Sequence, residues 1–507
     1  MKKHFVTLSI VLVMLSAIWS DFNVKIWTRP DRVIQWDVID YYGYLPAAFI
    51  YHDITLRFRD HYSGDKKFIF WAKKTANGKS VFKMTMGVSV MLSPFFFAAN
   101  AVAGHLGYNT GGYSLPYRFA IVMAGLFYLA LGLFFLSRVL RRHFSETVTA
   151  IVVLSLGLGT NLFWYSTFEP GMSHVYTFFL ASVFIYLTIL WHRHQTVSRA
   201  ILLGLIVGLL TLIRPVNALF ALFFIFYGIR NLQEFKNKAL LFWHKRQHMV
   251  LMIIFGFLVL LPQFVYWKTV TGHWMYYSYG KEGFFFLHPQ IIPVLFSFRK
   301  GWFVYTPVMI FAVAGIYFLY KRHTRFFLPV LLLLVVYLYV VSSWWCWWYG
   351  GSLGQRELID IYPFMALPLA ALLTQVGKLK KPVKYLAGTL VAFSVLMGAF
   401  YNIQYHYGAI HWDAMTQAAW FDSFGRVHPS PRFKHLIVPP DYSRALEGRP
   451  EKAASKIRKT EMLQKIIVRI KSDENWMKVI REKARQKNIP VDSMLFLDAR
   501  YVLEHEK

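Results

Sequence analysis

Apolar segments long enough to cross a lipid bilayer recur through the first 400 residues and dictate the fold class. The hydrocarbon core of a bilayer accepts only helices and closed barrels, because backbone polar groups there must be paired within the protein. The apolar runs here are continuous rather than alternating, which is typical of membrane helices. The sequence therefore predicts an all-α polytopic membrane protein with about eleven transmembrane helices, at residues 5–19, 117–137, 147–167, 174–191, 200–213, 215–229, 249–267, 302–320, 326–343, 359–376 and 384–403.

The basic residues are distributed around the same apolar segments. The chain is 56% hydrophobic, with mean hydropathy +0.38 and a formal net charge of +30. The basic residues cluster in short loops between apolar segments, as the positive-inside rule requires, so we expect no nucleic-acid partner. This places the N-terminus in the cytoplasm, the C-terminus on the extracytoplasmic side, and these loops inside: Arg138–His143, Trp191–Arg199, Arg230–His248, Lys321–Arg325 and Lys378–Lys384.

The chain divides into a membrane domain over residues 1–403 and an extracytoplasmic helical C-terminal region over 404–507. Residues Met84–Gly104 are apolar but carry Pro94, and counting them as a span would place basic loops outside, so we expect a re-entrant or interfacial segment. The single cysteine, Cys346, excludes an intrachain disulfide and a cysteine-rich zinc site. The absence of organelle signals fits a bacterial inner membrane.

The first large external loop, Asp21–Lys83, is expected to form interfacial helices and carries two carboxylates in an aromatic run. In a helix, spacings of three and four residues place Asp37, Asp40 and Tyr41 along one face, and Tyr42 follows directly. These carboxylates could serve as a catalytic base at the membrane surface. They could equally cap the N-terminus of an interfacial helix, where negative charge is favoured.

Three arginines lie on the external side, where the positive-inside rule does not favour them: Arg214, Arg299 and Arg356. An arginine at membrane depth costs on the order of 2.5–3.5 kcal/mol on insertion scales, so something should compensate it. A phosphate suits the guanidinium fork, whereas snorkelling or pairing with a carboxylate are the structural alternatives. Lys300, Glu169 and His174 belong to the same side, although a lone histidine is more often a structural residue at a helix end. The His, Asp and Glu spacing shows no strong metal motif.

With these residues in place, the chain resembles the GT-C superfamily of polytopic glycosyltransferases, in a branch like the protein O-mannosyltransferases and the lipid A aminoarabinose transferase. The likeness covers roughly residues 1–400. Its motifs are Asp37…Tyr41, Met172-Ser173-His174, Leu212-Ile213-Arg214-Pro215, Arg299-Lys300-Gly301 and the run from Gly350-Gly351-Ser352 to Arg356. The resemblance implies that the catalytic acid is Asp37, or else Asp40. The paired Asp-Glu of some members is absent, because Val38 follows Asp37.

The resemblance also implies a polyprenyl-phosphate sugar as donor and inverting transfer to an acceptor hydroxyl on a lipid, a glycan or a protein. The resemblance implies no definite cofactor and leaves a requirement for a divalent cation open. The candidates for substrate binding are then Tyr41, Tyr42, Glu169, His174, Arg214, Arg299, Lys300 and Arg356. Two alternatives stay open, a transporter or flippase for lipid-linked substrates and a ligase of preassembled lipid-linked glycans. Transporters often show paired halves, and none is visible here.

Overall fold

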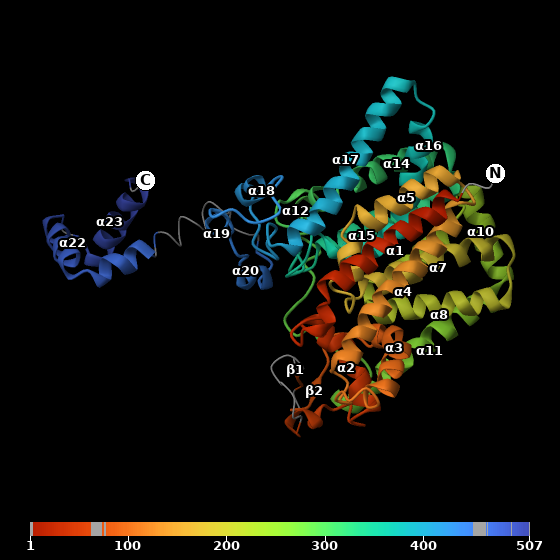
Figure 1. The fold of residues 1–507 in the computed structure, drawn as a ribbon, viewed down its shortest axis with the longest axis horizontal. Helices are drawn as coiled ribbons and strands as arrows, with labels where there is room; N and C mark the ends of the chain where they lie inside the picture. Colours follow the sequence, from red (N-terminus) through yellow and green to blue (C-terminus); the bar gives the residue numbers. More distant parts are fainter. Residues whose placement is uncertain are drawn as a thin grey trace.

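A computed structural model of the chain describes residues 4–61, 73–75, 78–449, 463, 465–487 and 489–505. Within these residues nearly all regular structure is helical, and the two short strands, β1 (Lys73–Lys74) and β2 (Ser80–Val81), pair antiparallel. The predicted all-α polytopic membrane protein is confirmed (Figure 1).

Seven helices in the described part of the chain are long and apolar enough to cross a membrane. They are α1 (Phe5–Val24), α4 (Leu115–Leu140), α7 (His174–Arg193), α11 (Arg246–Thr271), α15 (Thr324–Ser342), α16 (Tyr362–Val376, preceded by the 3-10 turn η5, Arg356–Ile361) and α17 (Lys381–His406). Shorter apolar helices stand between them: α3 (Gly87–Ala103), α5 (Glu146–Leu158), α8 (Val197–Ile213), the pair η4 (Pro215–Phe220) and α9 (Ala221–Phe226), and α14 (Val308–Arg322).

Two of the predicted spans are interrupted in the structure. The segment 147–167 divides into α5 and α6 (Leu162–Thr167), and 302–320 divides into α13 (Trp302–Tyr305) and α14 at Pro307. Proline lacks the backbone donor that a continuous helix needs, so this break follows from the sequence. Arg214 lies between α8 and η4, at the boundary between the predicted spans 200–213 and 215–229, and so outside a regular helix. Helix α3 has 17 residues, fewer than the about 20 of a full span.

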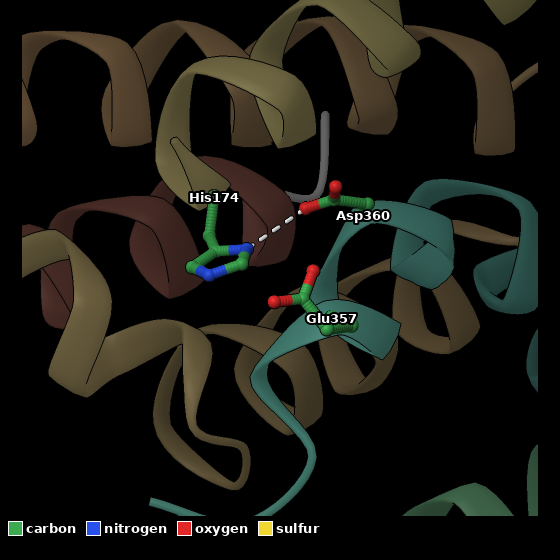
Figure 2. A group of neighbouring side chains, drawn as sticks. All are labelled: His174, Glu357 and Asp360. Carbon is green, nitrogen blue, oxygen red and sulfur yellow. Dashed lines mark hydrogen bonds and ion pairs between the residues drawn. The ribbon is translucent and has the colours of Figure 1, made fainter. Parts of the chain in front are cut away.

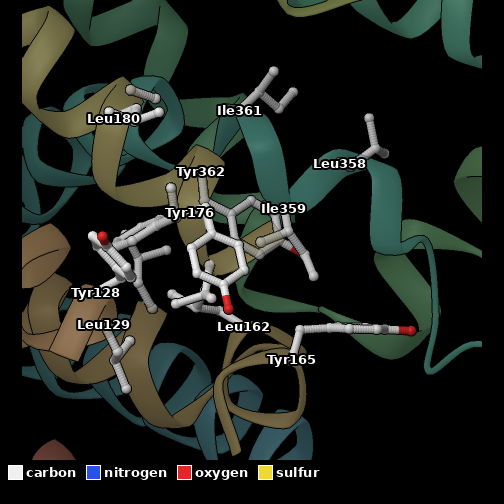
Figure 3. Packing of buried hydrophobic residues seen from close by; sticks show 14 of the residues in the cluster. Tyr128, Leu129, Leu162, Tyr165, Tyr176, Leu180, Leu358, Ile359, Ile361 and Tyr362 are labelled. Carbon is white, nitrogen blue, oxygen red and sulfur yellow. The ribbon is translucent and has the colours of Figure 1, made fainter. Parts of the chain in front are cut away.

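The remaining elements join or cover these helices. The first loop contains η1 (Ile26–Thr28), α2 (Asp37–Phe49) and η2 (Arg57–His61), and later connections contain α10 (Leu232–His244) and α12 (Ile291–Phe296). Figure 3 shows part of the core between α4, α6, α7 and the η5–α16 segment, a single hydrophobic cluster that includes Tyr128, Tyr165, Tyr176 and Tyr362. Within it the rings of Tyr128 and Tyr176 pack edge to face. This core packs against η5, which carries several residues of the candidate site.

Three of the predicted cytoplasmic loops meet at one end of the molecule. The ring of His143, after α4, packs edge-on against Phe326 at 4.9 Å, and Phe144 packs against His323 at 4.7 Å. Burial, followed by the positive charges of Arg325, His323 and Arg193, lowers the pKa of His143 to about 4. The basic loops after α4, α7 and α14 therefore share one face, as the charge pattern predicts.

The C-terminal region consists of two parts with different surroundings. Helices α18 (Gln417–Ser423), α19 (Phe433–Leu436) and α20 (Tyr442–Leu446) contribute to the main core. Helices α22 (Glu474–Gln486) and α23 (Val491–His505) share a separate small core with Ile470. Asp473 caps α22 by accepting a hydrogen bond from the backbone nitrogen of Trp476 at 3.0 Å.

Helices α8 and α11 pack closely against each other in the membrane domain. A Cβ atom at Gly208 would lie 2.5 Å from the carbonyl oxygen of Gly256, whereas one at Gly388 in α17 would meet nothing within 4 Å. We expect Gly208→Ala to lower the melting temperature in detergent because two backbones must separate. The matched variant Gly388→Ala should leave it unchanged or raise it, since alanine favours a helix. Equal melting temperatures for both variants would contradict the close packing of α8 and α11.

Candidate active site

A cavity of about 1200 Å³ opens at the end of the molecule away from the basic loops. Its wall is built from the start of α2, the loop before α7, the α8–η4 junction, and the segments 276–284 and 340–357. Trp412 and Tyr442 of the C-terminal region complete it. The cavity therefore draws on segments from nearly the whole chain, and much of its wall is aromatic.

An ion pair between Asp37 and Arg356 joins two sides of this cavity. Asp37 is the first residue of α2, and its carboxylate accepts a hydrogen bond from Nη2 of Arg356 at 2.9 Å. Arg356 begins η5, directly after the glycine-rich loop 350–354. Asp37 thus lies in the first turn of a helix, as the capping interpretation expects, and also in the cavity wall, as the catalytic interpretation expects.

Arg214 extends this pair into a network. Its guanidinium contacts the carboxylate of Glu357 and lies 3.0 Å from Oδ2 of Asp360. Nε of Arg356 lies 3.5 Å from the other oxygen of Glu357. Two guanidinium groups thus face three carboxylates, and carboxylate pairing compensates Arg214 and Arg356. Such a buried network is strongly destabilised when one member is removed, because a charge is then left without its partner.

His174 lies on the opposite side of Asp360. Its Nδ1 is 3.0 Å from Oδ1 of Asp360, and the hydroxyl of Tyr337 lies 3.3 Å from Oδ2 of the same carboxylate. A neutral imidazole that donates from Nδ1 keeps a lone pair on Nε2. His174 is only 1% exposed, its Nε2 has no hydrogen-bond partner, and the ring lines the cavity. His174 therefore keeps an unpaired acceptor nitrogen at the cavity wall.

Figure 2 shows His174, Glu357 and Asp360 as a group, the one set of metal-ligand type found among the described residues. Their ligand atoms lie within 4.8 Å of one another. However, Arg214 contacts both carboxylates, and Asp360 also binds His174. A divalent cation bound by the group would have to take the position of the guanidinium. With Arg214 in place the group does not fit a metal ion.

Helix α2 divides its polar residues between the cavity and the protein interior. Tyr41 lines the cavity near Asp37 and Arg214, but Asp40 and Tyr42 are buried away from it. The hydroxyl of Tyr42 donates to the carbonyl of Gly112 at 2.5 Å, which ties α2 to the loop before α4. Asp40 lies on the side of α2 that faces α11. Burial and the neighbouring Tyr266 chiefly raise the pKa of Tyr44, and the charge of Asp40 is close enough to raise it further.

Glu169 lies in the cavity wall between α6 and α7. Its Oε1 accepts a hydrogen bond from the indole nitrogen of Trp164 at 2.9 Å. Burial raises the pKa of this carboxyl group, an effect that Arg356 opposes and Asp37 reinforces. Glu169 is therefore a second carboxylate within electrostatic reach of the Asp37–Arg356 pair.

Arg299 and Lys300 lie behind the cavity wall and do not line it. Arg299 donates to the carbonyls of Asp413 and, at 3.2 Å, of Val438, while Lys300 donates to those of Ser352 and Trp412. The two cations join the C-terminal segment to the glycine-rich loop that leads to Arg356. This geometry favours a positioning role for them over direct contact with a ligand.

The carboxylate of Asp360 is hydrogen-bonded to both His174 and Arg214, yet no motif of the sequence singled this residue out. The signal was its place at the start of the predicted span 359–376, because an acid in an apolar span needs a functional or structural partner. Glu357 stands next to Arg356 and was recognisable only as its neighbour. Cys346 also lies in the wall, buried beside Tyr349.

We expect Arg214 to keep divalent cations out of this group of ligands. We expect Arg214→Ala to free the carboxylates of Glu357 and Asp360 and to give them affinity for a divalent cation. Addition of Mn²⁺ or Zn²⁺ should then raise the melting temperature of Arg214→Ala, and the double variant Arg214→Ala/Asp360→Asn should lose this response. A wild-type protein that responds as strongly as Arg214→Ala would contradict the competition between guanidinium and metal.

Lys300 gives the stability a pH dependence. Burial, which the charge of Asp413 only partly offsets, lowers the pKa of Lys300 to about 7 in the folded protein. Between that pH and the ordinary lysine pKa of about 10.4, the unfolded chain binds more protons than the folded one, so stability rises with pH. The melting temperature of the wild type should therefore rise relative to that of Lys300→Met from pH 7 to 9. The exposed control Lys384→Met should show no such trend, and a constant difference for Lys300→Met would refute the assignment.

No protein-family model and no curated protein matches this sequence. Among solved structures, the archaeal oligosaccharyltransferase AglB from Archaeoglobus fulgidus, in complex with an inhibitory peptide and a dolichol-phosphate, matches with 14% identity and a TM-score of 0.46, over 79% of this chain and 55% of that one. The Archaeoglobus fulgidus oligosaccharyltransferase in the apo form also matches, with 12% identity and a TM-score of 0.46, over 85% of this chain and 61% of that one. The same protein tethered to an acceptor peptide matches with 12% identity and a TM-score of 0.45, over 89% of this chain and 60% of that one. The chain thus spans less than two thirds of these proteins, and the likeness is too distant to assign its activity.

Proposed function

We propose that this protein is a membrane glycosyltransferase that moves a sugar from a polyprenyl-phosphate donor to an acceptor hydroxyl, with inversion at the anomeric carbon. The observation that supports it is the convergence of Asp37, Arg356, Arg214 and His174 on one cavity at the end of the membrane helices. An acid, two guanidinium groups and an acceptor nitrogen in one mixed aromatic and polar cavity are the groups that such a transfer requires.

The ion pairs suggest how the donor phosphate enters. Asp37 holds Arg356 by an ion pair in the cavity wall. A phosphate offers the guanidinium fork two oxygens and competes with the single carboxylate oxygen that Asp37 supplies. Binding of the donor phosphate to Arg356 therefore releases Asp37. The released carboxylate then faces the cavity as a base beside the bound donor.

The chemical step is a single displacement. The acceptor hydroxyl gives its proton to Asp37 while its oxygen forms a bond to the anomeric carbon. The bond from that carbon to the phosphate oxygen breaks, and the electron pair leaves with the polyprenyl phosphate. Arg356 and Arg214 stabilise the charge that develops on the phosphate. Nε2 of His174 accepts a hydrogen bond from a sugar hydroxyl and helps to orient the donor.

The distribution of basic residues indicates which side of the membrane the cavity faces. The basic loops after α4, α7 and α14 gather at one end and the cavity lies at the other. By the positive-inside rule the basic end is cytoplasmic. We therefore place the cavity on the extracytoplasmic side of a bacterial inner membrane, with membrane lipids and the lipid-linked donor as partners.

The choice between the two acids can be tested directly. Transfer from a labelled polyprenyl-phosphate sugar pool in membrane vesicles should fall at least about 100-fold in Asp37→Asn, because a general base contributes about 10²–10⁴. Asp40→Asn, at matched expression, should retain most of the activity of the wild type because Asp40 faces away from the cavity. Full activity in Asp37→Asn would refute the proposed base, and a product with retained anomeric configuration would refute the single displacement.

A further inference from the structure

Helix α10 exposes large apolar side chains along most of its length, and none of its residues is buried. The exposed fractions are 70% for Leu232, 47% for Phe235, 55% for Leu240 and 69% for Trp243. At about 100° per residue, these four residues and Ala239 fall within less than half of the helix circumference, here called the apolar arc. Exposed apolar surface that borders polar residues marks a site of interaction with a protein or a membrane.

Another side of α10 is fixed to the basic end of the membrane domain. The ring of Phe242 stacks on that of Phe224 in α9, with centroids 5.6 Å apart. Nζ of Lys238 donates a hydrogen bond to the carbonyl oxygen of Tyr227 at 2.7 Å. The ring of Tyr227 packs in turn on Phe326, which lies among the predicted cytoplasmic loops. Helix α10 therefore lies at the end of the molecule where the basic loops gather.

The side of α10 between these two is polar. It carries Gln233, Asn237 and His244, and Nε2 of Gln233 donates to Oδ1 of Asn237 at 3.1 Å. One apolar and one polar side along a basic helix are typical of an interfacial helix, whose apolar side enters the boundary between lipid headgroups and acyl chains. A helix that projected into the cytoplasm would instead leave Leu232 and Trp243 in water.

Helix α10 also leads directly into a span that faces lipid. Only Lys245 separates it from α11, little of which is buried inside the protein. At about 1.5 Å per residue, the 26 residues of α11 are longer than the hydrocarbon core of about 30 Å, so its first turn reaches the headgroup region. Because α10 ends just before α11 begins, α10 lies at the level of the lipid headgroups.

Two cations on this segment match the negative charge of a cytoplasmic leaflet. Lys236 lies within the apolar arc, and the guanidinium of Arg246 lies 5.8 Å from the ring centroid of Trp243. Both cations are exposed, and neither forms an ion pair with a carboxylate of the described residues. Long basic side chains place their stems along apolar surface and their charges among lipid phosphates. Clusters of Lys and Arg on an amphipathic helix are the ordinary means of binding anionic lipids.

We propose that α10 is an interfacial helix that binds anionic phospholipid in the cytoplasmic leaflet. Its apolar arc enters the headgroup boundary, and Lys236 and Arg246 contact the lipid phosphates. The site is independent of the proposed glycosyl transfer, because it lies at the opposite end of the membrane helices from the cavity. The basic loop Arg230–His248 thus contains a membrane-bound helix, in addition to the charge that the positive-inside rule requires.

Hydroxyl-radical footprinting of the full-length protein in nanodiscs of phosphatidylcholine and phosphatidylglycerol tests the position of α10. Phe235 and Phe496, on α23, are side chains of one type with matched exposure, 47% and 48%. Lipid should protect Phe235 and Trp243, so Phe235 should be oxidised several-fold more slowly than Phe496. Equal oxidation of the two phenylalanines would place α10 in water and overturn the proposal. Protection found only in nanodiscs that hold two protein molecules would indicate a second copy of the chain and would overturn it as well.

Spin-labelled lipids test the choice of headgroup. The wild type should associate with phosphatidylglycerol in preference to phosphatidylcholine. The double variant Lys236→Gln/Arg246→Gln should lower this selectivity about twofold or more, because each cation adds to the attraction of an anionic leaflet. The matched control Lys478→Gln/Arg481→Gln removes two exposed cations from α22 and should keep the selectivity of the wild type. Wild-type selectivity in both double variants would refute the binding of lipid phosphate by Lys236 and Arg246.

Discussion

The pairing of buried charge organises this end of the molecule. Arg214 and Arg356 are held below the surface only because Asp37, Glu357 and Asp360 meet them there. The five groups come from three separate segments, the start of α2, the α8–η4 junction and η5. The first loop, the α8–η4 junction and η5 must therefore reach their final positions together. The same network has one more carboxylate than guanidinium groups, so in the proposed function the donor phosphate has to exchange places with a carboxylate. This exchange connects the stability of the fold with its chemistry.

Much of the fold could be predicted from the sequence, because hydropathy and charge act over long segments. The long helices and the common face of three basic loops follow from such patterns. The breaks after Leu158 and before Pro307 are local effects that a sliding window averages out. Helix α3 is likewise too short for its hydropathy to show how it lies.

The candidate site was less predictable, because it depends on partners far apart in the sequence. Asp37 and Arg356 were recognisable from their types and surroundings, but the bond between them joins residues 319 positions apart. Arg299 and Lys300 resembled ligand-binding cations, yet they donate to backbone carbonyls of the C-terminal segment. Composition marks a boundary near residue 404, whereas Trp412 and Tyr442 beyond it complete the cavity. A polar segment after the last membrane helix gives no sequence signal that it folds back.

The single thiol of the chain has an experimental consequence. Cys346 is buried in the cavity wall, and this burial raises its pKa to about 12, so it stays protonated and unreactive at neutral pH. Cysteines introduced on exposed loops can therefore carry spectroscopic labels selectively, without removal of the native residue. Distances between the glycine-rich loop and the first loop can then be followed in a membrane as the cavity fills.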